Sequence, residues 1–262
     1  MAEPQIRFDD GAAYEDFMGK WSQLAGATFI DWLAPRAGLR WVDVGCGNGA
    51  FTGMLFERCA PAEVQGLDPS EGQLAFARQR LPGRPVQFQL GDAMTLPFAD
   101  NAFDAAAMAL VLFFVPEPPR GVAEMVRVVK PGGIVSAYVW DILGGGFPFA
   151  AVQEELAAFG MPPLYPPSVE ASRIDAMRGL WSGAGLVDVE TRQIHVQRTF
   201  ADFDTFWRIA RAGPPVAPRL AAMTPADVGA LKDRVRARLP IAADGSITYG
   251  AVANAVKGRR PG

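Results

Sequence analysis

Short runs of β-forming apolar residues alternate with helical patterns between residues 38 and 141, and this alternation restricts the fold more than any other feature of the chain. Apolar residues between the runs recur at intervals of three and four, which is the spacing of an amphipathic helix. Strands separated by helices form βαβ units. The sequence therefore predicts an α/β fold with a mostly parallel sheet and helices on both faces. The five predicted strands are residues 39–44, 64–67, 86–90, 103–111 and 134–140.

Two more strand-like runs lie nearer the C-terminus, at residues 186–196 and 247–256. We expect them to continue the same sheet, which makes it seven-stranded. Helical patterns separate them, near residues 203–210 and 225–239. These helices, with the aromatic-rich segment 1–35, are expected to form a helical cap over the carboxyl ends of the strands, where sheets of this kind bind ligands.

The composition excludes several classes of function. The chain has 25 Lys+Arg against 28 Asp+Glu, so it lacks the concentrated basic surface that nucleic-acid binding needs. Two cysteines, Cys46 and Cys59, and one histidine, His195, are too few for a disulfide framework or for a thiol- or histidine-based metal site. No stretch is long and apolar enough to span a membrane, and the polar N-terminus is not a signal peptide. We therefore expect a cytoplasmic protein without metal, nucleic-acid or membrane partners.

The strongest local signal is a glycine-rich stretch between the first predicted strand and the helix after it, VDVGCGNG at residues 42–49. Glycines at such a junction permit tight turns and let a ligand approach the backbone. The start of the helix adds free N–H groups and a partial positive charge. Gly45, Gly47 and Ala50 also satisfy the dinucleotide pattern G-x-G-x-x-G/A. A nicotinamide-dependent oxidoreductase is therefore one alternative.

Asp43 helps to separate the alternatives, because it lies inside a strand that should be buried on both faces. A buried carboxylate is costly unless a positive or hydrogen-bond-donating group meets it. A ligand with an ammonium group supplies such a partner, whereas a pyrophosphate does not. The competing interpretation is that Asp43 caps local backbone.

Two further carboxylates follow the next two strands. Asp68 ends the second strand, where it could accept both hydroxyls of a ribose or cap the helix after Pro69, although Ser70 can already cap that helix. Asp92 follows the third strand, where it could accept an exocyclic amine, with the N–H of Ala93 reaching an adenine ring. Gly-Asp alone is typical of an ordinary turn, so the assignment of Asp92 depends on its being the third aspartate at the end of a strand, after Asp43 and Asp68.

Five motifs occur together in one order along the chain. They are VDVGCGNG at residues 42–49, GLDPS at 66–70, GDAMTLPF at 91–98, FDAAAMALVLFFV at 103–115 and VVKPGG at 128–133. This set resembles the class I S-adenosylmethionine-dependent methyltransferases, and is most similar to the branch with the ubiquinone/menaquinone-type C-methyltransferases and many small-molecule methyltransferases. The resemblance implies a Rossmann-like fold, S-adenosyl-L-methionine as cofactor and a small-molecule methyl acceptor.

The resemblance also implies a set of cofactor-binding residues. Within the set, the three glycines would approach the methionine part and the ribose, and the first aspartate would support the amino group directly or through water. The second aspartate would hold the ribose hydroxyls, and the third, with the alanine after it, would contact the adenine. Ala109 and Leu110 would lie along the methionine part, and Tyr14 and Lys20 would close over the cofactor. The full set is Tyr14, Lys20, Asp43, Gly45, Cys46, Gly47, Gly49, Asp68, Pro69, Ser70, Asp92, Ala93, Ala109 and Leu110.

The expected organisation is one methyltransferase domain over residues 1–262. It divides into an N-terminal helical lid (1–35), a cofactor-binding core (36–141) and a part with the cap helices and the last two strands (142–262). The expected activity is methyl transfer from S-adenosylmethionine to a small, largely apolar molecule. A non-catalytic cofactor-binding protein of the same fold is the main alternative, and the oxidoreductase is disfavoured by Asp43.

The sequence offers only weak candidates for a general base. Relatives often carry histidines where this chain has Phe113 and Phe114. His195 is the only imidazole, and it could equally be a structural or surface residue. Asp141 follows the fifth strand and could equally belong to a turn. The expected walls of an acceptor pocket are the aromatic side chains of Phe113, Trp140, Phe147, Phe149 and Phe206.

Overall fold

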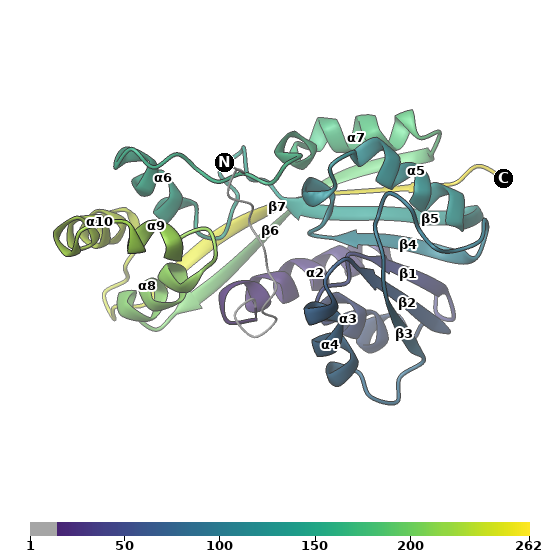
Figure 1. Cartoon of the computed structure of the whole chain (residues 1–262), viewed down its shortest axis with the longest axis horizontal. Helices are drawn as coiled ribbons and strands as arrows, with labels where there is room; N and C mark the ends of the chain where they lie inside the picture. The colour runs from purple at the N-terminus through teal and green to yellow at the C-terminus, as the bar shows by residue number, and fades with distance from the viewer. Residues whose placement is uncertain (1–14) are drawn as a thin grey trace.

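The sheet has seven strands in the order β3-β2-β1-β4-β5-β7-β6 in the computed structural model, which describes residues 15–262 (Figure 1). Neighbouring strands from β3 to β5 are parallel, and β7 runs antiparallel to both β5 and β6. The predicted α/β fold with a mostly parallel, seven-stranded sheet is therefore confirmed. The strands are β1 (Arg40–Val44), β2 (Glu63–Asp68), β3 (Val86–Leu90), β4 (Phe103–Ala109), β5 (Val129–Trp140), β6 (Val187–Phe200) and β7 (Ile247–Arg259).

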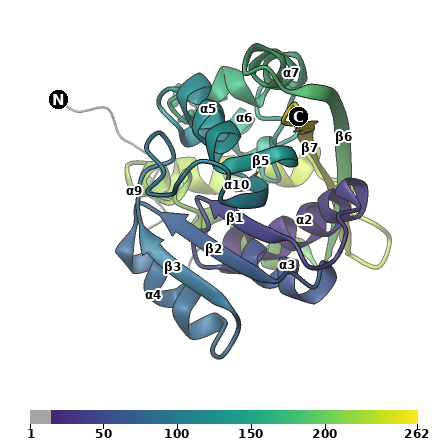
Figure 2. The same cartoon turned by 90° about the vertical axis from the view of Figure 1, so that its right-hand side faces the viewer.

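Helices cover both faces of the sheet (Figure 2). One face carries α2 (Lys20–Leu33), α3 (Ala50–Arg58) and α4 (Glu71–Arg80), and the other carries α5 (Pro118–Val128) and α7 (Ile174–Gly183). Local sequence sets several helix starts: the hydroxyl of Ser70 accepts a hydrogen bond from the N–H of Gln73, as predicted, and α5 begins with proline in its first turn.

The core lies between these layers. The side chains of Trp41, Val42 and Val44 in β1 are fully buried, as expected for a central parallel strand with both faces covered. Tyr138 of β5 packs against Phe29 of α2, with ring centroids 4.7 Å apart. The helix α2 is thus part of the layer on the sheet.

A long antiparallel hairpin carries the cap. The strands β6 and β7 have 14 and 13 residues, whereas β1 to β4 have five to seven. The hairpin therefore extends beyond the parallel strands, and its far end holds three helices (Figure 1). These helices are α8 (Phe203–Ala212), α9 (Ala217–Ala221) and α10 (Pro225–Arg238).

The helix α6 (Ala150–Ala158) completes the cap, and ion pairs join it to α10. Arg234 and Arg238 each donate a hydrogen bond to the carboxylate of Glu155, at 2.6 and 2.9 Å. The carboxylate of Glu155 is largely buried, and these two guanidinium groups hold its pKa below the usual value.

Four strand boundaries differ from the sequence prediction by two or more residues, and two of these are the ends of β6 and β7, which lie four and three residues beyond the predicted ends. The strand β4 ends at Ala109 because Leu110 has a left-handed backbone, with φ of 63°, and a 3₁₀ turn, η2 (Leu112–Phe114), follows. The strand β5 begins at Val129, five residues early, because Val129 pairs with Phe103 at the start of β4, ahead of an irregularity in the ladder. Within residues 15–262, none of the helices combines the length and the apolar character needed to cross a membrane.

Candidate functional site

The glycine loop, Asp43 and Asp68 lie together at the carboxyl ends of the neighbouring parallel strands β1 and β2. In register, Val44 of β1 pairs with Leu67 of β2, and Asp68 pairs with Leu90 of β3. The residues that follow each strand therefore meet at one edge of the sheet. The N–H groups of Gly45 and Cys46 both donate to the carbonyl of Leu67, at 2.7 and 3.0 Å, which ties the glycine loop to β2.

The glycine loop needs its glycines for backbone geometry. Gly45, Gly47 and Gly49 have φ values of 75°, 52° and 76°, in the left-handed region that favours glycine. A Cβ at Gly45 would lie 2.5 Å from a methyl carbon of Val111, and one at Gly49 would lie 3.2 Å from the Cα of Ala77. The glycine loop therefore packs closely against the residues that follow β4 and against α4.

Asp43 is fully buried beneath this loop. The hydroxyl of Thr52 in α3 donates to its Oδ2 at 2.6 Å, while its Oδ1 has no hydrogen-bond partner within residues 15–262. Burial raises the pKa of Asp43 to about 7, the Thr52 hydrogen bond opposes this shift, and the negative charge of Asp68 adds to it. The alternative in which Asp43 caps local backbone is not supported, because its one partner is a side-chain hydroxyl.

Replacing Thr52 by Val should lower the free energy of unfolding by about 1–3 kcal/mol at pH 8, because the buried carboxylate loses its only donor. Thr52→Ser keeps the hydroxyl and is the matched control, with a smaller expected loss. Urea unfolding of both variants measures the difference. A valine variant as stable as the parent at pH 8 would show that the hydrogen bond does not support the carboxylate.

Asp68 joins the glycine loop to the start of α4. Its Oδ2 accepts from the N–H of Gly47 and its Oδ1 from the N–H of Ser70, both at 2.9 Å. The side chain is 8% exposed. Asp68 therefore fixes the backbone on both sides of the space that a bound ribose would occupy, while Pro69 beside it is exposed.

Asp92 lies in a turn after β3 and is exposed. Its Oδ1 accepts from the N–H of Met94 at 2.7 Å, and its backbone bridges to Thr95. Ala93 is half-buried beside it. These contacts are those of an ordinary turn, and a contact between Asp92 and adenine stays a prediction.

The end of β4 completes the edge. Leu110 is buried, its N–H donates to the carbonyl of Tyr138 at 2.8 Å, and its left-handed backbone is unusual for a residue with a branched side chain. Such strain often marks functional sites. Ala109 is half-buried before it.

The remaining predicted cofactor residues have different surroundings. Lys20 is exposed at the start of α2. Cys46 is buried, and burial raises the pKa of its thiol well above the usual value, as for a packing residue. Tyr14 lies outside the described residues.

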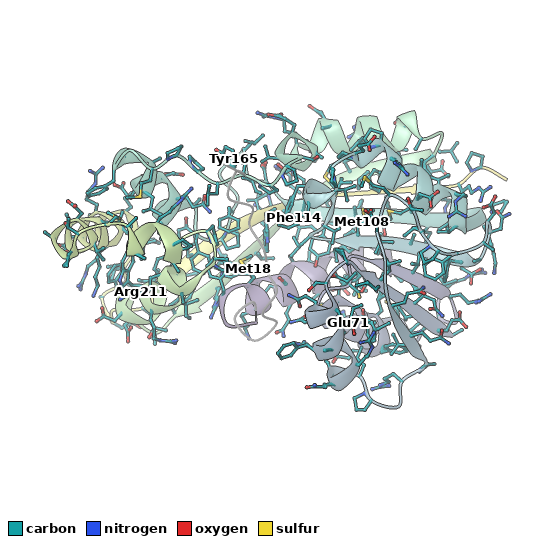
Figure 3. The ribbon with its side chains drawn as sticks, in the orientation of Figure 1. Met18, Glu71, Met108, Phe114, Tyr165 and Arg211 are labelled. Carbon is teal, nitrogen blue, oxygen red and sulfur yellow. The ribbon has the colours of Figure 1, made fainter. Side chains whose placement is uncertain are left out.

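A mostly apolar cavity of about 80 Å³ lies where the ends of β4 and β5 meet the cap. Figure 3 shows Met18 and Phe114, two of its lining residues, at this junction. The only lining residues with polar side-chain atoms are Gln153 and Trp140, and the indole N–H of Trp140 is buried and has no acceptor among the described residues. The lining residues are Met18, Leu110, Phe113, Phe114, Trp140, Ile142, Phe147, Gln153, Leu164, Pro166 and Pro215.

The predicted aromatic wall is only partly present. Phe113, Trp140 and Phe147 line the cavity, whereas Phe149 and Phe206 do not. Both of these are fully buried, because Phe149 stacks on Phe17 at 4.6 Å and lies 5.7 Å from Phe206. The expectation that these two rings form the wall is wrong.

Several cavity residues were not predicted from the sequence. Gln153 comes from α6, and Leu164 and Pro166 come from the proline-rich segment 161–167. The prolines of this segment predict a stiff connector, but they do not predict which of its side chains face the cavity.

Neither candidate base is among the residues that line the cavity, although Asp141 stands between two of them, Trp140 and Ile142. His195 is exposed on the edge strand β6, opposite Val252 of β7. Asp141 is half-buried in a turn, where its Oδ1 accepts from the N–H of Gly144 at 3.1 Å. Within the described residues the cavity lining contains no titratable side chain.

Comparisons with known proteins identify the family. The family model described as "Methyltransferase domain" matches residues 42–137. A ubiquinone/menaquinone biosynthesis C-methyltransferase UbiE from Roseobacter denitrificans is 31% identical over 188 residues, which cover 70% of this chain and 68% of that protein. A UbiE from Dinoroseobacter shibae is 41% identical over 108 residues, and this match covers 40% of this chain and 43% of that protein. The chain thus spans less than half the length of this second relative.

A solved structure agrees with the fold. Phosphoethanolamine N-methyltransferase 2 from Haemonchus contortus, in complex with S-adenosyl-L-methionine, is similar with a TM-score of 0.61 and 20% identity. The similarity covers 97% of this chain and 58% of that chain. The strand order, the glycine loop and the sequence relatives agree, and the chain belongs to the class I S-adenosylmethionine-dependent methyltransferases related to UbiE.

Proposed function

We propose that this protein transfers the methyl group of S-adenosylmethionine to a small, largely apolar acceptor. The observation that carries the proposal is Oδ1 of Asp43, a fully buried carboxylate oxygen that has no partner in the described part of the chain and lies two residues before the left-handed glycine loop. An ammonium group satisfies such an oxygen, directly or through one water, whereas the phosphates of a nicotinamide dinucleotide would repel it.

The residues of the edge fit the proposed cofactor. Gly45, Gly47 and Gly49 leave the backbone open to close approach, since none carries a Cβ. Asp68 ends β2 and accepts from the N–H groups of both Gly47 and Ser70, so its carboxylate is fixed at the edge where a ribose would lie. We assign it to the ribose hydroxyls. S-adenosylmethionine supplies an electrophilic methyl group on a sulfonium centre when it is bound.

The second group of residues concerns the adenine and the methionine part. We assign Asp92 and Ala93 to the adenine, because they follow β3 at the same edge. Leu110 borders both the edge and the cavity, and Ala109 ends β4 directly before it, so both would lie along the methionine part. Leu110 thereby connects the proposed cofactor site to the proposed acceptor site.

The cavity favours catalysis by alignment and exclusion of water. Its walls are apolar, and Phe113, Phe114 and Phe147 can contact the reacting part of an acceptor while keeping water away. Gln153 and the indole N–H of Trp140 can orient one polar atom of the acceptor. A base is needed only when the acceptor must lose a proton, and none lines the cavity.

Isothermal titration calorimetry with S-adenosylmethionine, S-adenosylhomocysteine and NADH tests the proposal. The first two ligands should bind saturably with one site per chain, and NADH should not bind. NADH binding without binding of S-adenosylhomocysteine would favour an oxidoreductase. Formation of S-adenosylhomocysteine with a panel of phenols and quinols would separate an enzyme from a non-catalytic cofactor-binding protein.

A further inference from the structure

The segment 92–100, between β3 and β4, contains the two residues that we assign to the adenine, and it is neither helix nor strand. It has a bridge between Asp92 and Thr95 and otherwise consists of turns, bends and irregular chain. Asp92 is exposed and Ala93 is half-buried, so packing in a core does not fix them. Irregular surface segments are mobile unless other contacts hold them. A precise contact with a ligand therefore depends on what holds this segment, which we call the 92–100 loop.

The helix α5 binds the main chain of the 92–100 loop at alternate residues. The Nε of Arg120 donates to the carbonyl of Met94 at 3.0 Å. Arg127 donates from Nη2 to the carbonyl of Leu96 at 2.9 Å and from Nη1 to the carbonyl of Phe98 at 2.7 Å. Hydrogen bonds from a charged donor are stronger than those between neutral groups. The loop is therefore held at three points by two guanidinium groups of one helix.

Glu124 belongs to the same face of α5. It lies four residues after Arg120 and three before Arg127, which is the spacing of neighbours on a helix surface. Its Oε2 accepts from the N–H of Leu96 at 2.8 Å, and its carboxylate accepts from Nε and Nη2 of Arg127 at 2.7 and 2.8 Å. This bidentate pair orients both side chains toward the loop, and the hydrogen bonds from Arg127 hold the pKa of Glu124 below its usual value.

The contacts from α5 reach both residues assigned to the adenine. The N–H of Met94 donates to Oδ1 of Asp92 at 2.7 Å, while the carbonyl of Met94 accepts from Arg120, so Met94 connects α5 to Asp92. A Cβ on Gly121 of α5 would lie 3.9 Å from the carbonyl oxygen of Ala93. The backbone of the helix therefore packs directly beside Ala93.

We propose that Arg120, Glu124 and Arg127 are positioning residues for the cofactor. They hold the 92–100 loop in the geometry in which Asp92 accepts the exocyclic amine of the adenine and the N–H of Ala93 meets its ring. The inference rests on the proposed function, because it uses the assignment of Asp92 and Ala93 to the adenine. None of the three side chains needs to touch the cofactor, since each acts through the main chain of the loop.

Two matched ligands test this positioning. S-inosylhomocysteine differs from S-adenosylhomocysteine in having a carbonyl in place of the exocyclic amine and a proton on the adjacent ring nitrogen. Calorimetry should show that the parent binds the adenosyl compound about tenfold more tightly, the range for a hydrogen bond to a charged group. Arg127→Met should weaken binding of the adenosyl compound and bring the two affinities within about threefold of each other, because the loop then no longer fixes Asp92. Arg127→Lys keeps one charged donor and should retain part of the preference.

A control and a milder variant separate positioning from general stability. Arg173→Met removes another Arg–Glu pair three residues apart, with Nε 2.7 Å from Glu170, and should leave the preference at the parent's value. Glu124→Gln keeps an oxygen for the N–H of Leu96 but loses the charge, and should give an intermediate preference even if Arg127→Met does not fold. Thermal unfolding identifies a temperature at which each variant is folded.

The outcomes distinguish this inference from the proposed function. A preference equal to the parent's in Arg127→Met, or in Glu124→Gln if the first variant does not fold, would overturn the positioning role. A parent that binds both compounds equally well would overturn it too, because the loop would then not recognise the adenine. Absence of S-adenosylhomocysteine binding by the parent would instead contradict the proposed function.

Discussion

Replacing Asp68 by Ala is expected to weaken binding of S-adenosylhomocysteine by about 1.5–3 kcal/mol, or roughly 10- to 150-fold. The variant loses charge-assisted hydrogen bonds to the proposed ribose. It also releases the N–H groups of Gly47 and Ser70, which both donate to this carboxylate. The glycine loop and the start of α4 then lose their common anchor, so a lower Tm is expected as well. Calorimetry at a temperature where both proteins are folded measures the affinity.

Two variants separate binding from loop structure. Asp68→Asn keeps the shape but can accept from only one of the two backbone donors through its single oxygen, so its affinity should fall between those of the parent and the alanine variant. Asp92→Ala removes an exposed carboxylate with one backbone donor, and should cost less affinity. An alanine variant at position 68 that binds within twofold of the parent would remove Asp68 from the cofactor site.

Affinity for S-adenosylhomocysteine is expected to rise about tenfold between pH 6 and pH 8. The pKa of Asp43 is raised to about 7 by burial, so the free protein holds this carboxyl mostly protonated at pH 6 and mostly ionised at pH 8. An ammonium group beside Oδ1 favours the ionised form and lowers the pKa in the complex. Binding near pH 7 therefore releases a proton, and affinity increases with pH until the free carboxyl is fully ionised.

Calorimetry at pH 6, 7 and 8, in two buffers with different ionisation enthalpies, gives both the affinity and the number of protons released. The control Asp43→Asn cannot ionise and should bind more weakly, with an affinity that does not change over this range. A parent whose affinity is also flat would place the ammonium group elsewhere. In the ligand-free protein the same raised pKa predicts falling stability from about pH 4 to pH 7, because the folded state holds the proton that the unfolded state has released.

The core of the fold could be predicted because its signals are local. Buried parallel strands appear as continuous apolar runs, and Ser70 caps α4 where the sequence places a capping residue. The boundaries that differed depend on distant partners. The left-handed backbone of Leu110 is held by the carbonyl of Tyr138, and the early start of β5 depends on the pairing of Val129 with Phe103 of β4. No pattern within the strand itself carries that information.

The glycine loop and Asp68 could likewise be found from the sequence, whereas the acceptor side could not. Phe147 and Phe149 are two residues apart and equally apolar, yet the first lines the cavity and the second stacks on Phe17 in the core. This distinction arises from contacts between segments far apart in the chain.

The long β6–β7 hairpin allows segment 201–246 to change in evolution independently of the glycine loop and its strands. Phe200 and Ile247 are cross-strand partners, so segment 201–246 leaves and rejoins the sheet at one point, about 5 Å across. Pro215 lies in this segment, while the glycine loop, Asp43 and Asp68 lie in strands and loops outside it. A different segment could be substituted between the same two partners without shifting the register of β1 or β2. The part of the proposed acceptor cavity that Pro215 forms can therefore change, or be redesigned by grafting, while the proposed methyl-donor site is inherited intact.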